Sequence, residues 1–315
     1  MIARISALGL VLFAAPALAD PLTRDLPEPP VRFDASSTVN DHLRCLDDAD
    51  VTLVSGHRGG PEPGFPENAI ETFANTLSQG PYLLEVDVRQ TADGVYVLIH
   101  DNTLERTTTG EGRVDETSWA ELKTYRLVDN DGVQTEFRTP SVTEALAWAE
   151  GRAFLQLDVK QGVDIAEFAR FVAASGAADT AAVIAYSVED ALAAARAHPR
   201  ISVSVEVTDT ATLDALIDGG LSPERMMAWT GVSPEPKPEL WAMLEARGVV
   251  AAFGALWYMD GEVRETGDVS IYAELATMGV DVLSSDLHRL AFDAINAERD
   301  ASPAVAACTA RYAER

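Results

Sequence analysis

Short apolar runs alternate with amphipathic segments along the chain from Val51 onward. Each apolar run has the length of a strand, and the segments between the runs show the spacing of apolar residues that is typical of helices. Helix starts are signalled as well, for example by Ser141 and Glu144, which have the spacing of a capping box ahead of ALAWAEG. The predicted strands are 52–55, 83–88, 96–100, 154–159, 182–186, 201–207, 226–229, 249–253 and 280–284. This alternation predicts a parallel α/β sheet, either an eight-fold barrel or an open doubly wound sheet.

One of the nine predicted strands does not fit the parallel pattern. The runs 83–88 and 96–100 are separated only by RQTADGV, which is too short for a crossover helix and carries the Asp-Gly pair of a tight turn. We therefore expect 96–100 to be an antiparallel return arm, which leaves eight parallel strands. The sequence thus favours a (β/α)8 TIM barrel, with an insertion over about 102–139, where periodicity is weak.

The N-terminal part of the chain differs from the rest. The opening stretch MIARISALGLVLFAAPALA has one arginine, an apolar run and small residues at its end, and it predicts a signal peptide over 1–19, cleaved after Ala19. The run is short for a membrane span. We expect a periplasmic or secreted protein with no stable membrane insertion after cleavage. Residues 20–50 are rich in proline and polar residues and predict an extended lead-in, and 51–315 predict one barrel domain.

The chain is strongly acidic, with a net charge of −26 over 315 residues. Such a surface repels nucleic acid and anionic bilayers, so neither is an expected partner. The charge suits a small-molecule substrate whose phosphate is held by local cations. It is equally explained as a trait of solubility or salt tolerance. The oligomeric state is left open.

Carboxylates gather at the predicted strand ends, which is where a barrel carries its active groups. Glu85 and Asp87 lie two apart on one strand and therefore share a face, and Asp158 and Lys160 do the same on the next parallel strand. Oxygen ligands in this number call for Ca²⁺ or Mg²⁺. Alternatively, Lys160 and Arg58 alone balance the acids in an ion-pair network. The metal site, with Glu85, Asp87 and Asp158 as ligands, is the favoured reading.

Two histidines are predicted to reach the same rim. His57 and Arg58 follow the first strand, and His100 ends the return arm. An arginine and a divalent cation draw charge from a phosphate, while one imidazole removes a proton and the other returns one. The set suits phosphoryl chemistry.

Several stretches together are specific enough to indicate a family. GHRGG…PENAIETF, LLEVDVRQTADGVYVLIHDNTLERTT and LQLDVK resemble the glycerophosphodiester phosphodiesterase family of the phospholipase-C-like barrel superfamily. The resemblance is dense from Gly56 to about Lys160 and thinner through Asp286. It implies hydrolysis of a glycerophosphodiester to glycerol 3-phosphate and an alcohol, with attack by the substrate's own neighbouring hydroxyl.

The resemblance also implies roles for single residues. His57 and His100 are the implied acid–base pair, and Arg58 contacts the phosphate. The implied metal ligands are Glu85, Asp87 and the carboxylate at 158. Lys160, Glu67 and Asn68 are assigned to substrate binding, and the last two are expected to order the site and to start the following helix.

Two departures from the family pattern concern the substrate. The usual Glu-x-Lys is Asp158-Val-Lys160 here, which is one methylene shorter, and AAFGALWYMD replaces a common Trp-Thr-x-Asn strand end. Trp257, in the replacement, is assigned to substrate binding, with a purely structural role as the alternative. Two other functions remain open: a lysophospholipase D or sphingomyelinase-D-like activity on lipids, and an inactive barrel that only binds phosphodiesters.

The chain has two cysteines, Cys45 and Cys308, near its two ends. Export places them in an oxidising compartment. A closed barrel puts its last strand beside its first, and Cys45 precedes the first strand while Cys308 follows the last. We therefore predict a Cys45–Cys308 disulfide that ties the two ends together.

Overall fold

The computed structural model describes residues 26–29, 38–297, 303–305 and 307–308. The predicted signal peptide, 1–19, and its cleavage site lie outside these ranges, as does most of the predicted lead-in ahead of residue 38. None of the helices in the described ranges combines the length and the apolar character that crossing a bilayer requires.

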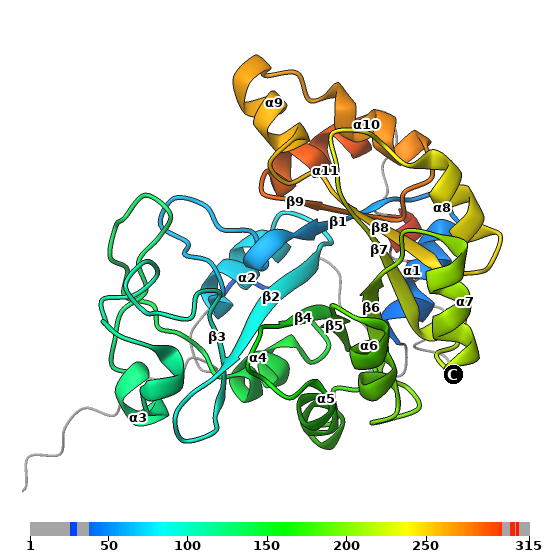
Figure 1. Ribbon diagram of the computed structural model, residues 1–315. Coiled ribbons are helices and arrows are strands. Elements are labelled where there is room, and N and C mark those ends of the chain that lie inside the picture. The colour runs from blue at the N-terminus through cyan, green and yellow to red at the C-terminus, as the bar shows by residue number, and fades with distance from the viewer. Residues whose placement is uncertain (1–25, 30–37, 298–302, 306, 309–315) are drawn as a thin grey trace, which may run out of the picture.

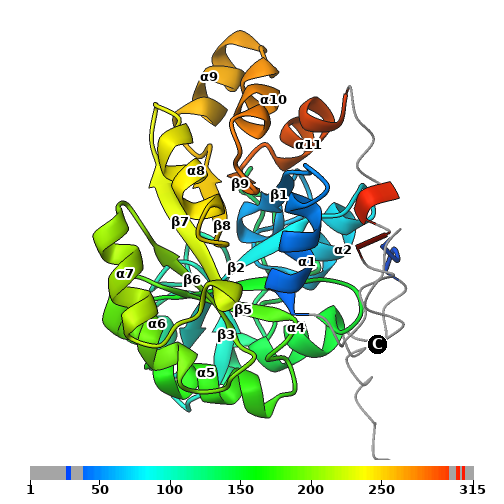
Figure 2. The same cartoon turned by 90° about the vertical axis from the view of Figure 1, so that its right-hand side faces the viewer.

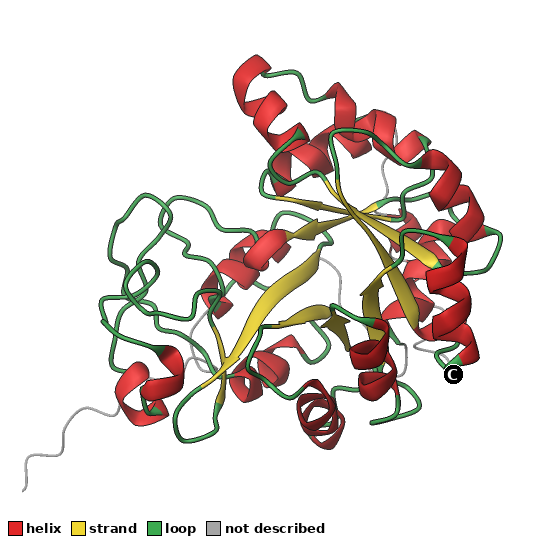
Figure 3. Ribbon diagram, viewed as in Figure 1, coloured by secondary structure: helices red, strands yellow, loops and turns green. Residues whose placement is uncertain are grey.

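Eight parallel strands of the described chain close into a barrel, which confirms the predicted fold (Figures 1 and 3). The order around the barrel is β1-β9-β8-β7-β6-β5-β4-β2, and pairing of β1 with β2 closes it. The strands are β1 Leu53–Gly56, β2 Leu83–Gln90, β4 Leu155–Val159, β5 Ala181–Ala185, β6 Ser202–Glu206, β7 Met226–Val232, β8 Val250–Gly254 and β9 Val282–Ser285.

The remaining strand, β3 (Tyr96–Leu98), is the predicted antiparallel arm. It pairs with the end of β2, with Val88 opposite Leu98 and Gln90 opposite Tyr96. The arm is shorter than predicted, because pairing stops before His100, which lies in a bend.

Helices surround the barrel (Figure 3) and bury the outward face of its strands. Leu84, Val86 and Val88 alternate with the acidic residues of β2 and pack in the main apolar core. The helices are α1 Val39–Asp47, α2 Ile70–Leu77, α3 Trp119–Leu122, α4 Val142–Ala149, α5 Ile165–Ala174, α6 Val188–Ala195, α7 Thr210–Asp218, α8 Pro238–Glu245, α9 Met259–Thr266, α10 Ser270–Thr277 and α11 His288–Asn296, with single 3-10 turns η2 His57–Gly59, η3 Val114–Glu116 and η4 Pro223–Arg225.

Helix α1 corrects the prediction of an extended lead-in over 20–50 at residues 39–47. Thr38 and Asp41 form a capping box at its start, and Leu43 and Leu46 are buried in a second apolar cluster with residues of the barrel interior. This local cap and the apolar face stabilise a helix where proline content had indicated none. In Figure 2 α1 is seen in front of the strands, and it contacts β8.

The predicted disulfide is present. Cys45 on α1 is bonded to Cys308, 263 residues further along the chain, and both side chains belong to the same buried cluster as Leu43. The bond therefore joins α1 to the C-terminal segment.

The insertion between β3 and α4 is mostly loop (Figure 3), with η3 and α3 as its short helices. It has a small core of its own, made of Val97, Ile99, Leu104, Val114 and Leu122. Because it follows the return arm directly, it lies beside the carboxyl end of β2.

Candidate active site

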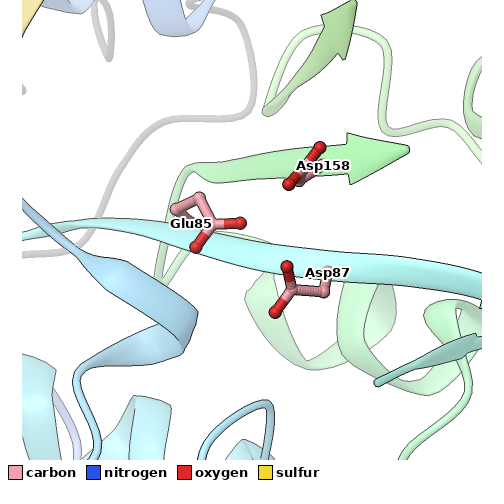
Figure 4. Close-up of side chains that lie close together, drawn as sticks. All are labelled: Glu85, Asp87 and Asp158. Carbon is pink, nitrogen blue, oxygen red and sulfur yellow. The ribbon is translucent and has the colours of Figure 1, made fainter. Parts of the chain in front are cut away.

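Three carboxylates project from two neighbouring strands at the carboxyl end of the barrel. Asp87 on β2 lies directly opposite Asp158 on β4, and Glu85 shares the face of Asp87. One oxygen from each of the three residues lies within 4.8 Å of the others (Figure 4). This spacing could hold a metal ion, and the three residues are those that the sequence analysis proposed as ligands.

Lys160 lies among these acids. Its Nζ is 2.6 Å from an oxygen of Asp87 and 2.5 Å from one of Asp158. Burial lowers the pKa of Lys160, but the charges of Asp87 and Asp158 outweigh burial and raise it above the usual value. The lysine therefore stays charged and compensates two of the three acids.

Glu85 has no such partner. Its Oε2 accepts a hydrogen bond from the backbone N–H of Arg58 at 2.7 Å, but among the described residues its buried Oε1 has none. Burial, with repulsion from Asp87, raises the pKa of Glu85 to about 8. A cation bound beside Glu85 would stabilise its ionised form, which burial and Asp87 now disfavour.

His57 is held by an aspartate from the far end of the chain. Its Nδ1 is 2.6 Å from Oδ1 of Asp286, just after β9. Burial lowers the pKa of His57, but the hydrogen bond to Asp286 and the charges of Glu85 and Asp286 outweigh it and raise the pKa above 6.5. The backbone of Asp286 is fixed in turn, because its N–H donates to the buried carboxylate of Asp260 at 2.7 Å.

His100 has a comparable partner beside it in sequence. Its Nδ1 is 2.7 Å from Oδ1 of Asp101, and Arg106 from the insertion holds both oxygens of Asp101. Both imidazoles thus present Nδ1 to an aspartate. Since an ionised carboxylate only accepts hydrogen bonds, each Nδ1 carries its hydrogen and Nε2 is left to exchange a proton.

Glu67 and Asn68 act on neighbouring side chains. Glu67 is 2% exposed, and both of its oxygens accept from Arg58 and Arg106. Asn68 donates to Asp87 at 2.7 Å and accepts from the N–H of Asp87 at 2.9 Å. Both residues therefore position neighbouring groups of the site, as expected, and the substrate contact assigned to them stays a prediction. Neither residue caps α2, whose N-cap is Ala69.

Backbone strain collects around this rim. In the described chain four residues other than glycine have positive φ, and Arg58, Asn68 and Trp257 are three of them. Gly59 has φ of 84°, and a Cβ there would lie 2.2 Å from the ring of Phe73. Strained residues that neighbouring contacts hold in place are typical of functional sites.

Trp257 follows β8 on the same rim, where it is 70% exposed, and the adjacent Tyr258 is 52% exposed. Tyr186, after β5, donates from its hydroxyl to Asp158 at 2.6 Å. Tyr186 therefore borders the carboxylate cluster, whereas Trp257 is open to solvent after β8 and its predicted substrate contact stays a prediction.

Some of these residues were missed by sequence reasoning. Asp286 and Tyr186 each stand at the end of a predicted strand, and that position was the available signal for both. Arg106 belongs to the stretch HDNTLERTT, but no spacing rule connects an arginine in a loop with Glu67, 39 residues away.

Comparison with known proteins agrees with the motifs. The model of the glycerophosphoryl diester phosphodiesterase family matches residues 57–217. A glycerophosphodiester phosphodiesterase of Caldanaerobacter subterraneus is 35% identical over 114 residues, covering 36% of this chain and 46% of that protein. Glycerophosphodiester phosphodiesterase 1 of Mus musculus is 32% identical over 131 residues, covering 40% of this chain and 39% of its own length. The chain thus spans less than half the length of these curated relatives.

A solved structure matches more of the chain. The glycerophosphoryl diester phosphodiesterase of Parabacteroides distasonis is 32% identical, with a TM-score of 0.76, and the match covers 85% of this chain and 94% of that one. The family model, this structural match and the rim of histidines and carboxylates agree, and the chain belongs to the glycerophosphoryl diester phosphodiesterase family.

Proposed function

We propose that this protein is an exported, metal-dependent phosphodiesterase that hydrolyses glycerophosphodiesters to glycerol 3-phosphate and an alcohol. The observation that carries the proposal is the arrangement of one rim. Two imidazoles, each with Nδ1 on an aspartate, border a cluster of three carboxylates. This set combines a proton donor, a proton acceptor and a cation site, which cleavage of a phosphodiester requires.

Glu85, Asp87 and Asp158 would hold the divalent cation, either Ca²⁺ or Mg²⁺. The donor set fits, because all three ligands are oxygens, and the buried Oε1 of Glu85 lacks a partner among the described residues. When bound, the cation draws charge from the phosphate oxygens. Asp158 stands where the family usually has glutamate, and its Oδ1 is held by the hydroxyl of Tyr186.

The histidines move the protons. One imidazole Nε2 takes the proton of the attacking hydroxyl as the new P–O bond forms. The other gives its proton to the leaving alkoxide as the P–O bond to the alcohol breaks. The raised pKa of His57 suits it to the second role, because a protonated imidazole is needed there. When the substrate's own hydroxyl attacks, this first step leaves a cyclic phosphate. Water then attacks its phosphorus: one imidazole takes the proton of the water and the other returns a proton to the ring oxygen as its P–O bond breaks, which gives glycerol 3-phosphate.

Arg58 and Lys160 supply fixed positive charge at the phosphate. Glu67 holds the guanidinium of Arg58, and Asp87 and Asp158 hold Lys160. These contacts fix both cations before substrate arrives, so little reorganisation is needed in the transition state.

The exposed aromatic residues support a second substrate class. Trp257 and Tyr258 lie on the rim and are 70% and 52% exposed. Such side chains suit contact with an acyl chain or a lipid surface. A lysophospholipid therefore belongs in the substrate panel beside the water-soluble diesters.

The decisive experiment assays that panel with and without a chelator and measures released alcohol and glycerol 3-phosphate. We expect cleavage of soluble glycerophosphodiesters, loss of activity on chelation, and recovery with Ca²⁺ or Mg²⁺. Glu85→Gln should reproduce the chelated state, whereas Glu189→Gln, which removes an exposed acid on α6, should keep full activity. Full turnover after exhaustive chelation, with no metal found by elemental analysis, would contradict the proposal.

Export rests on the predicted signal peptide and is supported by the disulfide, which is stable in oxidising compartments. We expect the mature protein to begin at Asp20 and to be recovered outside the cytoplasm. Mass measurement of the purified protein tests this, and an intact chain retaining residues 1–19 would contradict it.

A further inference from the structure

A cavity of about 510 Å³ lies beside the candidate active site. Its walls come from residues that directly follow site residues on three segments. Arg89 to Ala92 continue from Asp87, Asn102 comes just after His100 and Asp101, and Gln161 to Val163 follow Lys160. The fourth wall is the start of η3 in the insertion. The cavity is therefore placed to receive a group attached to the reacting phosphate.

Arg89 is the residue that decides which kind of ligand this cavity can bind. It stands two residues beyond Asp87 on β2 and so belongs to the strand face that carries Glu85 and Asp87. Its Nε donates to the backbone carbonyl of His100 at 2.8 Å. Among the described residues no carboxylate forms an ion pair with it, and its Nη groups have no acceptor. A half-buried guanidinium without an ion-pair partner can still make a charge-assisted contact with an anion that enters the cavity.

The other two charged residues of the cavity wall, Arg113 and Asp115, pair with each other. Arg113 donates to Asp115 through Nε at 2.8 Å and through Nη2 at 2.7 Å, and Glu116 lies 3.7 Å away. The remaining polar lining includes the amide side chains of Gln90, Asn102 and Gln161. Among the described residues that line the wall none is aromatic, so these residues do not form the cage that a quaternary ammonium group prefers. Arg89 is left without an ion-pair partner among the described residues, and the charges of Asp87, Asp101 and Asp115 act on it from further away.

We propose that this cavity binds an anionic oxygen group, a carboxylate or a phosphate, on the alcohol half of the substrate. Arg89 makes the charge-assisted contact, and the amides accept and donate to hydroxyl or amino groups beside it. The enzyme then prefers diesters with acidic head groups to those with neutral or cationic ones. This inference rests on the proposed phosphodiesterase function and names its substrate class.

Two diesters that differ by one carboxylate test the proposal. Glycerophosphoserine is glycerophosphoethanolamine with an added carboxylate, so the ratio of their kcat/KM values isolates the recognition of that group. We expect the wild type to favour the serine diester, and Arg89→Gln to lower the ratio by about tenfold. Because Arg89 also holds the backbone of His100, the substitution could displace that histidine. Such a displacement would lower kcat/KM for both diesters by a common factor and leave their ratio unchanged. Arg89→Lys keeps the charge and should retain part of the preference.

A second pair distinguishes the source of the anion. Glycerophosphoinositol and its 4-phosphate differ by one phosphate, so a larger fall in their ratio than in the serine pair assigns the site to phosphate. Arg247→Gln is the matched control. Arg247 is an exposed arginine just after α8 and forms an ion pair with Asp214, so the substitution removes the same charge away from the cavity. Both ratios should stay unchanged.

The outcomes separate this inference from the proposed function. Unchanged ratios in Arg89→Gln, with normal turnover of glycerophosphoethanolamine, overturn the anion site and leave the phosphodiesterase intact. The anion site is likewise overturned, and the phosphodiesterase function left intact, if the wild type shows no preference within either pair of diesters. Failure of the metal-loaded wild type to cleave any of the four diesters overturns the proposed function, and the anion site with it.

Discussion

Asp286 controls the proton affinity of His57. Burial alone would lower the pKa of His57, and the hydrogen bond at 2.6 Å with the neighbouring negative charges raises it above 6.5. If His57 is the general acid, its protonated form is active, and activity is lost as pH rises through its pKa. Asp286→Asn should therefore shift the alkaline limb of the kcat/KM profile to lower pH by about one unit.

A pH profile from about pH 5 to about pH 10 measures this shift at saturating metal. Asp293→Asn is the control, because it removes an exposed carboxylate from the same helix, α11, and should not move the limb. An alkaline limb that stays in place in Asp286→Asn would show that another group sets it.

Asp281 carries a second perturbed carboxyl, away from the catalytic rim. It precedes β9, its Oδ2 accepts from the N–H of Ala251 at 2.6 Å, and burial with the nearby charges of Asp47 and Glu245 raises its pKa to about 8. The pKa of Asp47 is raised as well. The folded protein therefore keeps a proton on Asp281 that the unfolded chain releases above about pH 4.

Stability must then fall as pH rises, because the folded state binds more protons than the unfolded state over this range. The contribution of Asp281 is fully present below about pH 4 and is lost as pH approaches about 8. Asp281→Asn removes the titration and keeps an acceptor for Ala251. Thermal melts should show the variant to be more stable than the wild type by several degrees near neutral pH, with the difference disappearing near pH 4. A variant that is less stable at every pH would contradict this account.

Helix α1 links the disulfide to the barrel at the level of elements. Cys45 is buried on α1 among residues of the barrel interior, and its bond to Cys308 closes a loop of 263 residues. Closing so long a loop restricts the unfolded chain and stabilises the fold by up to about 5 kcal/mol in the chain-entropy model. Reduction, or the double substitution Cys45→Ala and Cys308→Ala, should lower Tm.

Loss of the disulfide should leave the geometry of the active site unchanged. The site residues lie at the carboxyl ends of the strands, whereas Cys45 precedes β1 at the opposite end of the barrel. Turnover at moderate temperature should therefore match the oxidised wild type. Equal Tm values for the oxidised and reduced protein would remove the stabilising role, and loss of turnover well below Tm would mean that the bond also shapes the site.

The features that the sequence predicted depend on local patterns or on closure of the barrel, whereas most of those it missed depend on contacts between residues far apart in the chain. The strands, the return arm after Val88 and the disulfide follow from local periodicity, turn length and the closure of a barrel. Helix α1 was missed because its cap and apolar face are short and follow a proline-rich stretch. The contacts of Asp286 with His57 and of Arg106 with Glu67 were missed because tertiary folding, and no local pattern, brings those residues together.

At the scale of the whole molecule the net charge of −26 opposes the approach of the anionic substrates that we propose for the site. An approaching anion meets a repulsive field over most of the surface before it reaches Arg58, Lys160 or Arg89. Raising the salt concentration from about 10 mM to about 150 mM shortens the Debye length from about 30 Å to about 8 Å, which screens the distant acids more than the contacts inside the site. The kcat/KM for the anionic glycerophosphoglycerol should therefore rise with salt by about twofold or more.

Glycerophosphoethanolamine serves as the comparison because it has no net charge near neutral pH, so its kcat/KM should change little over the same range. Saturating metal in both series keeps occupancy of the carboxylate cluster constant. Separate kcat and KM values locate the effect: repulsion of the free substrate acts on encounter and so appears in kcat/KM, with kcat unchanged. A fall in kcat/KM for the anionic diester as salt increases would mean that the cations of the rim dominate the field that substrate meets, and that the acidic surface has no part in substrate selection.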